Sequence, residues 1–137
     1  MPLLARSIRD ALLTANIAAP NANATTYSMF IDLGVANSFP TTASISLVAN
    51  VPAIANLANT KVITISVEDA DANANANAAA LALVGSGTIT GGASGSAAAE
   101  IAFALPGNVR RFVRLKAVGG SAAGTTITET ATAEIRV

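Results

Sequence analysis

The chain has 137 residues, the usual size of one domain, so one folded unit with a single core is expected. Its net charge is zero, and no overall field directs it toward nucleic acid or an anionic membrane, so neither is predicted as a partner. Only 12% of the residues are charged, against roughly 25% in ordinary soluble domains. A surface of small, uncharged side chains suits a subunit that lies against other proteins. The alternative is an ordinary secreted or surface β-domain whose exterior carries no binding function.

The first 25 residues are predicted to form an N-terminal arm, ahead of a single β-sandwich domain over 26–137. Apolar spacing within 5–15 fits a short helix, and an extended arm fits equally. Charged side chains interrupt any apolar run of signal-peptide length, namely Arg6, Arg9 and Asp10. Later uncharged runs are broken by Asn, Thr, Ser and Pro, so neither an export signal nor a transmembrane segment is predicted.

From Thr41 onward the dominant pattern is period two, with β-branched residues and with Gly, Pro, Asn or Asp at the breaks, which is typical of strands. Strands are predicted, in chain order, at 27–35, 43–51, 61–69, 78–85, 100–107, 110–120 and 125–137. Their inward-facing residues are expected to include Ile45, Leu47, Ile63, Ile65, Phe103, Val113 and Leu115. Buried parallel strands would be continuously apolar, so this alternation indicates an all-β fold of antiparallel strands, either a β-sandwich or a jelly roll.

Glycine-rich segments at 85–99 and 118–126 are predicted to be loops or hairpin tips. The chain has no histidine and no cysteine, and therefore lacks the commonest general base, the commonest metal ligand and a thiol nucleophile. A serine nucleophile would need Lys61 or Lys116 as its base, and no spacing selects a pair of carboxylates. The chain is therefore predicted not to be an enzyme, with no catalytic residue and no cofactor.

The stretch "EDADANANANAAALALV", residues 68–84, has acidic and amide side chains at alternate positions from Asp69, as a calcium-binding EF-hand loop does. Such a loop needs glycine at its sixth position and glutamate at its twelfth, where this chain has Ala74 and Ala80. No metal site is predicted, and the stretch is interpreted as a polar bend of turn-forming residues. The alternative is a weak cation site at Glu68, Asp69 and Asp71.

The run "VRRFVRLK" carries half of the basic residues, namely Arg110, Arg111, Arg114 and Lys116. Three of these four face away from Val113 and Leu115, on the same side as Phe112. A basic and partly aromatic stripe is a feature of nucleic-acid binding, but a neutral chain argues against that partner. Arginine also favours protein interfaces and bidentate pairing with carboxylates, so the run is either an interface or a solvated outer face.

Three stretches together resemble the jelly-roll cement family, small decoration proteins that stud the capsids of some tailed bacteriophages. The start "MPLLARSIRDALLTANIAAPNANA" is similar to the family's basic arm and Ala/Asn/Pro-rich stretch. The middle "ITISVEDADANANANAAALALV" resembles its strand, acidic bend and second strand, with alanines where the family has an aromatic residue. The stretch "ALPGNVRRFVRLKAVGG" resembles its turn followed by an arginine-bearing strand in which an aromatic residue precedes Val-Arg.

The resemblance implies a homodimeric jelly-roll subunit on the outer surface of a virion, bound across boundaries of the major capsid protein after assembly in the bacterial cytoplasm. Its function would be structural, since non-covalent contacts across a seam stabilise the shell. The residues expected to contact the shell or a second subunit are Arg6, Arg9, Arg110, Arg111, Phe112 and Arg114. Charge reversal at Arg111 and Arg114 is expected to weaken attachment without changing the circular dichroism spectrum.

Two other classes of function remain as alternatives. A carbohydrate-binding or adhesin-like β-sandwich would need exposed aromatic faces, and the chain has no Trp, one Tyr and four Phe. A self-assembling fibre or surface-layer subunit shares the low charge and the threonine-rich strands.

Overall fold

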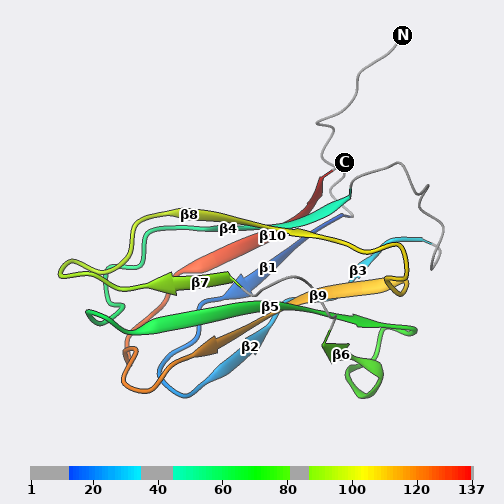
Figure 1. The fold of residues 1–137 in the computed structure, drawn as a ribbon. Coiled ribbons are helices and arrows are strands. Elements are labelled where there is room, and N and C mark those ends of the chain that lie inside the picture. Colours follow the sequence, from blue (N-terminus) through cyan, green and yellow to red (C-terminus); the bar gives the residue numbers. More distant parts are fainter. Residues whose placement is uncertain (1–12, 35–44, 81–86, 137) are drawn as a thin grey trace, which may run out of the picture.

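A computed structural model describes residues 13–34, 45–80 and 87–136, which form two antiparallel sheets facing one another (Figure 1). The four-stranded sheet has the order β1 (Thr14–Ala18), β10 (Thr130–Arg136), β4 (Ser46–Val51) and β8 (Ala99–Ala104). The six-stranded sheet runs from β2 (Thr25–Tyr27) through β9 (Phe112–Gly119) and β5 (Val62–Ala70) to β6 (Ala79–Ala80). In that sheet β3 (Ile31–Asp32) also pairs with β9, and β7 (Gly87–Thr90) pairs with β5.

The predicted all-β antiparallel sandwich is confirmed. The chain changes sheet repeatedly: β1, β4, β8 and β10 belong to one sheet, and the strands between them belong to the other. The only named helix in the described ranges is one 3₁₀ turn, η2 (Asn75–Asn77). None of these ranges contains a helix with the length and hydropathy to span a membrane.

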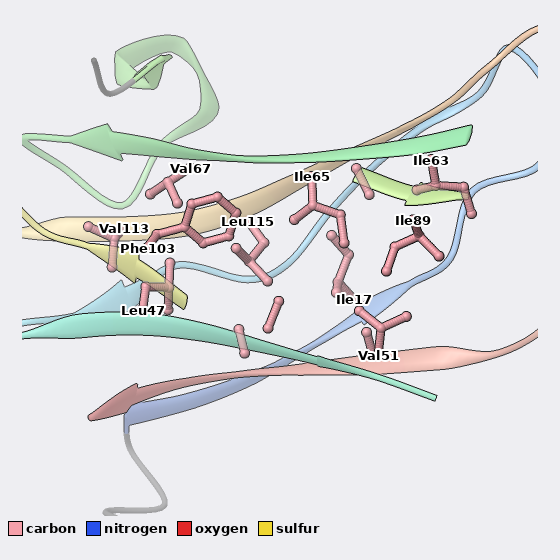
Figure 2. Close-up of a cluster of buried hydrophobic side chains, with 14 of the residues drawn as sticks. Ile17, Leu47, Val51, Ile63, Ile65, Val67, Ile89, Phe103, Val113 and Leu115 are labelled. Atoms are coloured by element: carbon pink, nitrogen blue, oxygen red, sulfur yellow. The ribbon is translucent and has the colours of Figure 1, made fainter. Parts of the chain in front are cut away.

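The core lies between the two sheets, where alternate residues of each strand point inward (Figure 2). The predicted inward residues of β4, β5 and β9 are buried, with Leu47, Val113 and Leu115 fully excluded from water. Burial of each large aliphatic side chain contributes roughly 1.5–3 kcal/mol. Alanines such as Ala49 and Ala133 also lie in this layer with no exposed surface. The period-two pattern therefore identified the core correctly along these strands.

Three expectations about element boundaries are wrong. The predicted arm over 1–25 contains β1, which pairs with β10 from Thr14 to Ala18, so the sheet begins before residue 26. The predicted glycine-rich loop contains β7, whose Ile89 is buried. The last strand begins at Thr130 instead of 125, because the backbone N–H of Ile127 binds the side-chain oxygen of Asn21 at 2.9 Å and leaves the ladder.

Two more predicted strands are shorter than expected. The strand predicted over 27–35 is interrupted, because Ser28–Phe30 separates β2 from β3. The strand predicted over 78–85 has only β6 within the described part of the chain, and residues 81–85 lie outside it.

Candidate protein-binding surface

The acidic bend and the arginine run lie side by side in the six-stranded sheet. The register of β5 against β9 places Glu68 opposite Arg114, and Asp69 opposite Val113. Separate ion pairs therefore join the two segments, although 46 residues separate Glu68 from Arg114. Since each strand has alternating faces, Phe112, Arg114 and Lys116 point away from the core, as the sequence predicts.

Arg114 is the most buried of the three arginines although it faces outward, with 6% of the residue exposed. Its Nε and Nη2 donate to Oε1 of Glu68 at 3.0 and 2.8 Å, and its Nη1 donates to Oδ1 of Asn75. The guanidinium carbon lies 4.1 Å from the ring centroid of Tyr27 and 4.7 Å from that of Phe30. Arginine is suited to this position because its flat cation stacks on aromatic rings while its edge donates to a carboxylate.

An aromatic surface, made of Tyr27, Met29, Phe30 and Phe112, lies around this arginine. Tyr27 is 46% exposed and Met29 is 80% exposed, and they are the only exposed large apolar residues in the described chain. Phe30 and Phe112 pack edge to face, with centroids 6.4 Å apart and planes at 78°. A hollow of about 430 Å³ opens between Tyr27–Phe30 and Asn73–Asn75, with Arg114 in its lining.

The Ser28–Phe30 segment has this exposed shape because the edge strand of the sheet is interrupted there. The backbone N–H of Ser28 donates to the carbonyl of Leu115 at 3.0 Å, and the N–H of Leu115 donates to the hydroxyl of Ser28 at 2.9 Å. A side-chain oxygen thus replaces the backbone acceptor that a continuous strand would offer, and Met29 and Phe30 leave the ladder. Ser28 itself is buried, at 4% exposure.

Arg110 holds the acidic bend at the end of β5. Its Nε and Nη2 donate to Oδ1 of Asp69 at 3.0 and 2.9 Å, and its backbone N–H donates to Oδ2 of Asp69 at 3.0 Å. Nη1 reaches Asp71 at 3.5 Å. The hydrogen bond to Asp69 raises the pKa of Arg110. Asp69 and Asp71, which the sequence suggested as the start of a cation-binding loop, therefore both form ion pairs with Arg110.

Arg111 pairs with Asp32 at the rim of the aromatic surface, where their side chains are 47% and 46% exposed. Its Nε and Nη2 donate to the two carboxylate oxygens at 2.8 and 2.9 Å, and the backbone N–H of Gly34 donates to Oδ1 at 2.8 Å. These hydrogen bonds, that from Arg111 first, lower the pKa of Asp32 from 3.8 to about 2. The Arg111 guanidinium also lies 5.1 Å from the Phe112 ring centroid, so it packs against the aromatic surface.

The outer face of the four-stranded sheet has a different character. Strand register places Arg136 of β10 diagonally across β4 from Glu100 of β8, and its Nη1 and Nη2 donate to the Glu100 oxygens at 2.9 and 3.1 Å. Nε of Arg136 also donates to Glu134 at 2.6 Å. A shallower hollow of about 550 Å³ is lined mainly by small and polar residues: Asn50, Val51, Pro52, Ala98, Ala99, Glu100, Thr130 and Thr132.

Four of the predicted interface residues come together, because Arg110, Arg111, Phe112 and Arg114 occupy one end of β9 and the turn before it. The other two, Arg6 and Arg9, lie outside the described residues. Ion pairs inside the chain engage all three arginines of the run. Charge reversal at Arg114 would place a second carboxylate beside buried Glu68, so the expectation of an unchanged fold is withdrawn for that residue.

The sequence analysis missed the residues that make the surface: Tyr27, Met29, Phe30 and Asn75. The run "YSMF" has three large apolar side chains in four positions, which does not fit a half-buried strand with period two. That irregularity was a signal that at least one of them faces water. Asn75 gave no signal, since its role depends on how the bend folds back over β9.

Within the described ranges, no group of three acidic, His or Cys side chains is placed to hold a metal ion. The arginines are committed to carboxylates, and the exposed side chains around them are aromatic rings and a thioether. Tyr, Phe, Met and Arg are the residue types enriched where proteins bind proteins. The arrangement is therefore suited to non-covalent recognition of another protein surface.

Comparison with known proteins assigns no family, since no family model matches the chain and no curated protein matches it in sequence.

Proposed function

We propose that this protein is a structural subunit that attaches through its aromatic surface to the outside of a tailed-bacteriophage capsid and reinforces the shell. The observation that carries the proposal is that Tyr27 and Met29, the exposed large apolar residues of the described chain, lie together above buried Arg114. Binding energy at protein interfaces concentrates in a few aromatic and arginine side chains at the centre of the contact. A surface of this kind supplies such a centre.

Burial of Arg114 makes the surface rigid before binding. The rings of Tyr27 and Phe30 rest on a guanidinium that Glu68 and Asn75 hold in place. Side chains that are fixed in advance lose little entropy on association, so more of the contact energy appears as affinity. A subunit that must hold many identical seams closed benefits from such preorganisation.

The capsid as partner comes from the resemblance to the jelly-roll cement family, and the fold is compatible with it. A jelly roll is built from two packed antiparallel sheets, and the order β1-β10-β4-β8 facing β2-β9-β5-β6 supports that subtype. In this proposal the partner is the major capsid protein, the location is the virion surface, and the subunit is a homodimer. Contacts across subunit boundaries stabilise the shell because opening it must also break them.

Co-sedimentation tests the proposal. Virus particles from the source of this chain are purified on a density gradient, and the protein is quantified in the particle band. We expect many copies per intact particle, and we expect shells that lack the protein to rupture at a lower temperature until purified protein is added back. Absence from particles, together with no effect of added protein on rupture, would reject the capsid as partner.

The alternatives give other results in the same preparation. A reproducible hit on a glycan array would favour a carbohydrate-binding module. Polymers formed by the purified protein alone would favour a fibre or surface-layer subunit.

A further inference from the structure

In the part of the chain that the structure describes, the outer edge of β8 has no partner strand. Natural sheets block their edges with short strands, bulges, prolines or charges, because free backbone groups pair with other chains. One edge of the six-stranded sheet is interrupted at Ser28–Phe30, and the other consists of the short strands β6 and β7. The remaining edge, β1, lies along β2, where the hydroxyl of Thr26 donates to the carbonyl of Ala18 at 2.6 Å. By contrast, β8 is regular over Ala99–Ala104.

The directions of the backbone groups on β8 follow from one hydrogen bond. The N–H of Leu105 donates to the carbonyl of Ile45 at 2.8 Å, toward β4. In an antiparallel ladder these directions alternate along the strand. The N–H and C=O groups of Phe103, Ile101 and Ala99 therefore also face β4, and those of Glu100, Ala102 and Ala104 face outward. Within the described chain, no strand pairs with that side of β8.

The single charge on β8 does not protect the edge either. Both carboxylate oxygens of Glu100 accept hydrogen bonds from Arg136, which draws the side chain back over the sheet and also binds Glu134. The side chains of Ala102 and Ala104, which lie on the same outer face of the sheet as Glu100, are methyl groups. On the inner side, Ile101 is only half-buried at the margin of the core, where Gly87 of β7 lies against it.

We propose that β8 pairs with β8 of a second copy of this chain, antiparallel and about a two-fold axis through Ala102, so that the four-stranded sheets join into one. Ala102 then lies opposite its own copy, and Glu100 lies opposite Ala104, so every outward backbone group of the strand is paired. Ile101 lies opposite Phe103 of the second copy, which covers its exposed side. The pairing is self-complementary, as a two-fold interface requires, and it consumes the edge in both copies, so assembly stops at a dimer.

Charge disfavours the neighbouring register that has its axis at Glu100. Two copies of Glu100 placed directly opposite one another would repel. With the axis at Ala102 each Glu100 faces a methyl group, and its own Arg136 remains bound to it. The pairing gives a geometry to the homodimer of the proposed function and rests on that function only for its biological role. The edge pairs whether or not the protein binds a capsid.

Sedimentation velocity and amide hydrogen exchange on the purified chain test this pairing without any capsid. We expect a concentration-dependent dimer in which the amides of Glu100, Ala102 and Ala104 are protected from exchange and lose that protection on dilution. A monomer at the highest soluble concentration, an open polymer, or a dimer in which these amides exchange freely would overturn the proposal. The exchange measurement needs no variant, so a folding defect cannot confuse it.

Charge variants at Ala102 test the register. Ala102→Lys places two cations opposite each other on the axis, and Ala102→Glu places two anions, so each should raise the dimer dissociation constant at least about tenfold. An equimolar mixture of the two variants should recover a dimer. The matched control is Ala18→Lys, an exposed alanine on the opposite edge of the same sheet, which should dimerise as the wild type does. Variants that dimerise fully alone, or a mixture that stays monomeric, would contradict the axis.

A dimer that fails to attach to particles would leave the β8 pairing intact and reject the capsid. A monomer that attaches to particles would reject the β8 pairing and leave the capsid as partner.

Discussion

The two outer faces of the sandwich use the same residue types in different ways. On the six-stranded sheet the side chains of Arg114 and Glu68 are 7% and 12% exposed, beneath aromatic rings. On the four-stranded sheet those of Arg136 and Glu100 are 42% and 54% exposed. Removing one partner of a buried ion pair strongly destabilises the fold, whereas water and salt screen the attraction between the charges of an exposed pair. The buried pair fixes the rings that form the aromatic surface, and the exposed pair holds Glu100 over the sheet beside the edge of β8.

The largest effect should come from breaking the buried pair. Arg114→Met leaves Glu68 as an uncompensated buried charge and should lower the free energy of unfolding by about 3–5 kcal/mol. Urea denaturation monitored by circular dichroism measures the change. Adding Glu68→Leu should restore most of the loss, because a hydrophobic pair of similar volume can replace a buried ion pair. If Arg114→Met alone were as stable as the wild type, the ion pairs of the two faces would not differ in their contribution to stability.

Removal of the Ser28 hydroxyl should have the next largest effect. Ser28→Ala leaves the buried N–H of Leu115 without an acceptor, which costs roughly 1–3 kcal/mol. The same denaturation experiment measures it, with Ser121→Ala as the control at an exposed loop position. An equal effect of both changes would mean that the hydroxyl does not shape the Ser28–Phe30 segment.

Glu100→Gln on the four-stranded sheet should change stability less than either of those variants. The pair that it breaks is exposed, and its contribution should vanish in about 1 M salt, where the screening length is near 3 Å. Unfolding midpoints of wild type and variant at low and high salt provide the comparison. A loss as large as that of Arg114→Met, or one that salt does not change, would remove the distinction between the two faces.

The smallest effect concerns pH and Asp32. Its pKa is lowered to about 2, so the Asp32–Arg111 pair contributes stability above the ordinary value of 3.8 and loses it as the pH falls toward 2. The stabilities of wild type and Asp32→Asn should therefore converge between about pH 4 and pH 2. Carbon-detected NMR titration should place the carboxyl midpoint of Asp32 near pH 2. A midpoint near 4 would mean that the pair does not persist in solution.

Local patterning predicted the strands whose large apolar side chains alternate, and it failed where they are sparse. Four core strands, β4, β5, β8 and β9, were found with the correct faces. The pattern missed β1 and β7, because each has a single large inward residue, Ile17 or Ile89, among small ones. Pairing with a neighbouring strand holds these segments in the sheet, and that neighbour is distant in the sequence.

The candidate surface was predictable only in pieces. The arginine run and the acidic bend were each recognised, but their union depends on the register that sets Glu68 opposite Arg114. A shift of one residue would have turned one of the two toward the core. The contribution of Tyr27 and Phe30 depends on the interruption of an edge strand by Ser28, which no local pattern specifies.

Binding of matched variants to capsids that lack the protein tests the central claim most directly. The double variant Tyr27→Ala and Met29→Ala changes the aromatic surface, while Thr130→Ala and Thr132→Ala change exposed positions on the other face. The first pair should weaken attachment at least about tenfold with the circular dichroism spectrum unchanged, and the second should have no effect. Full attachment of the first pair, or loss confined to the second, would contradict the assignment of the aromatic surface as the site of attachment.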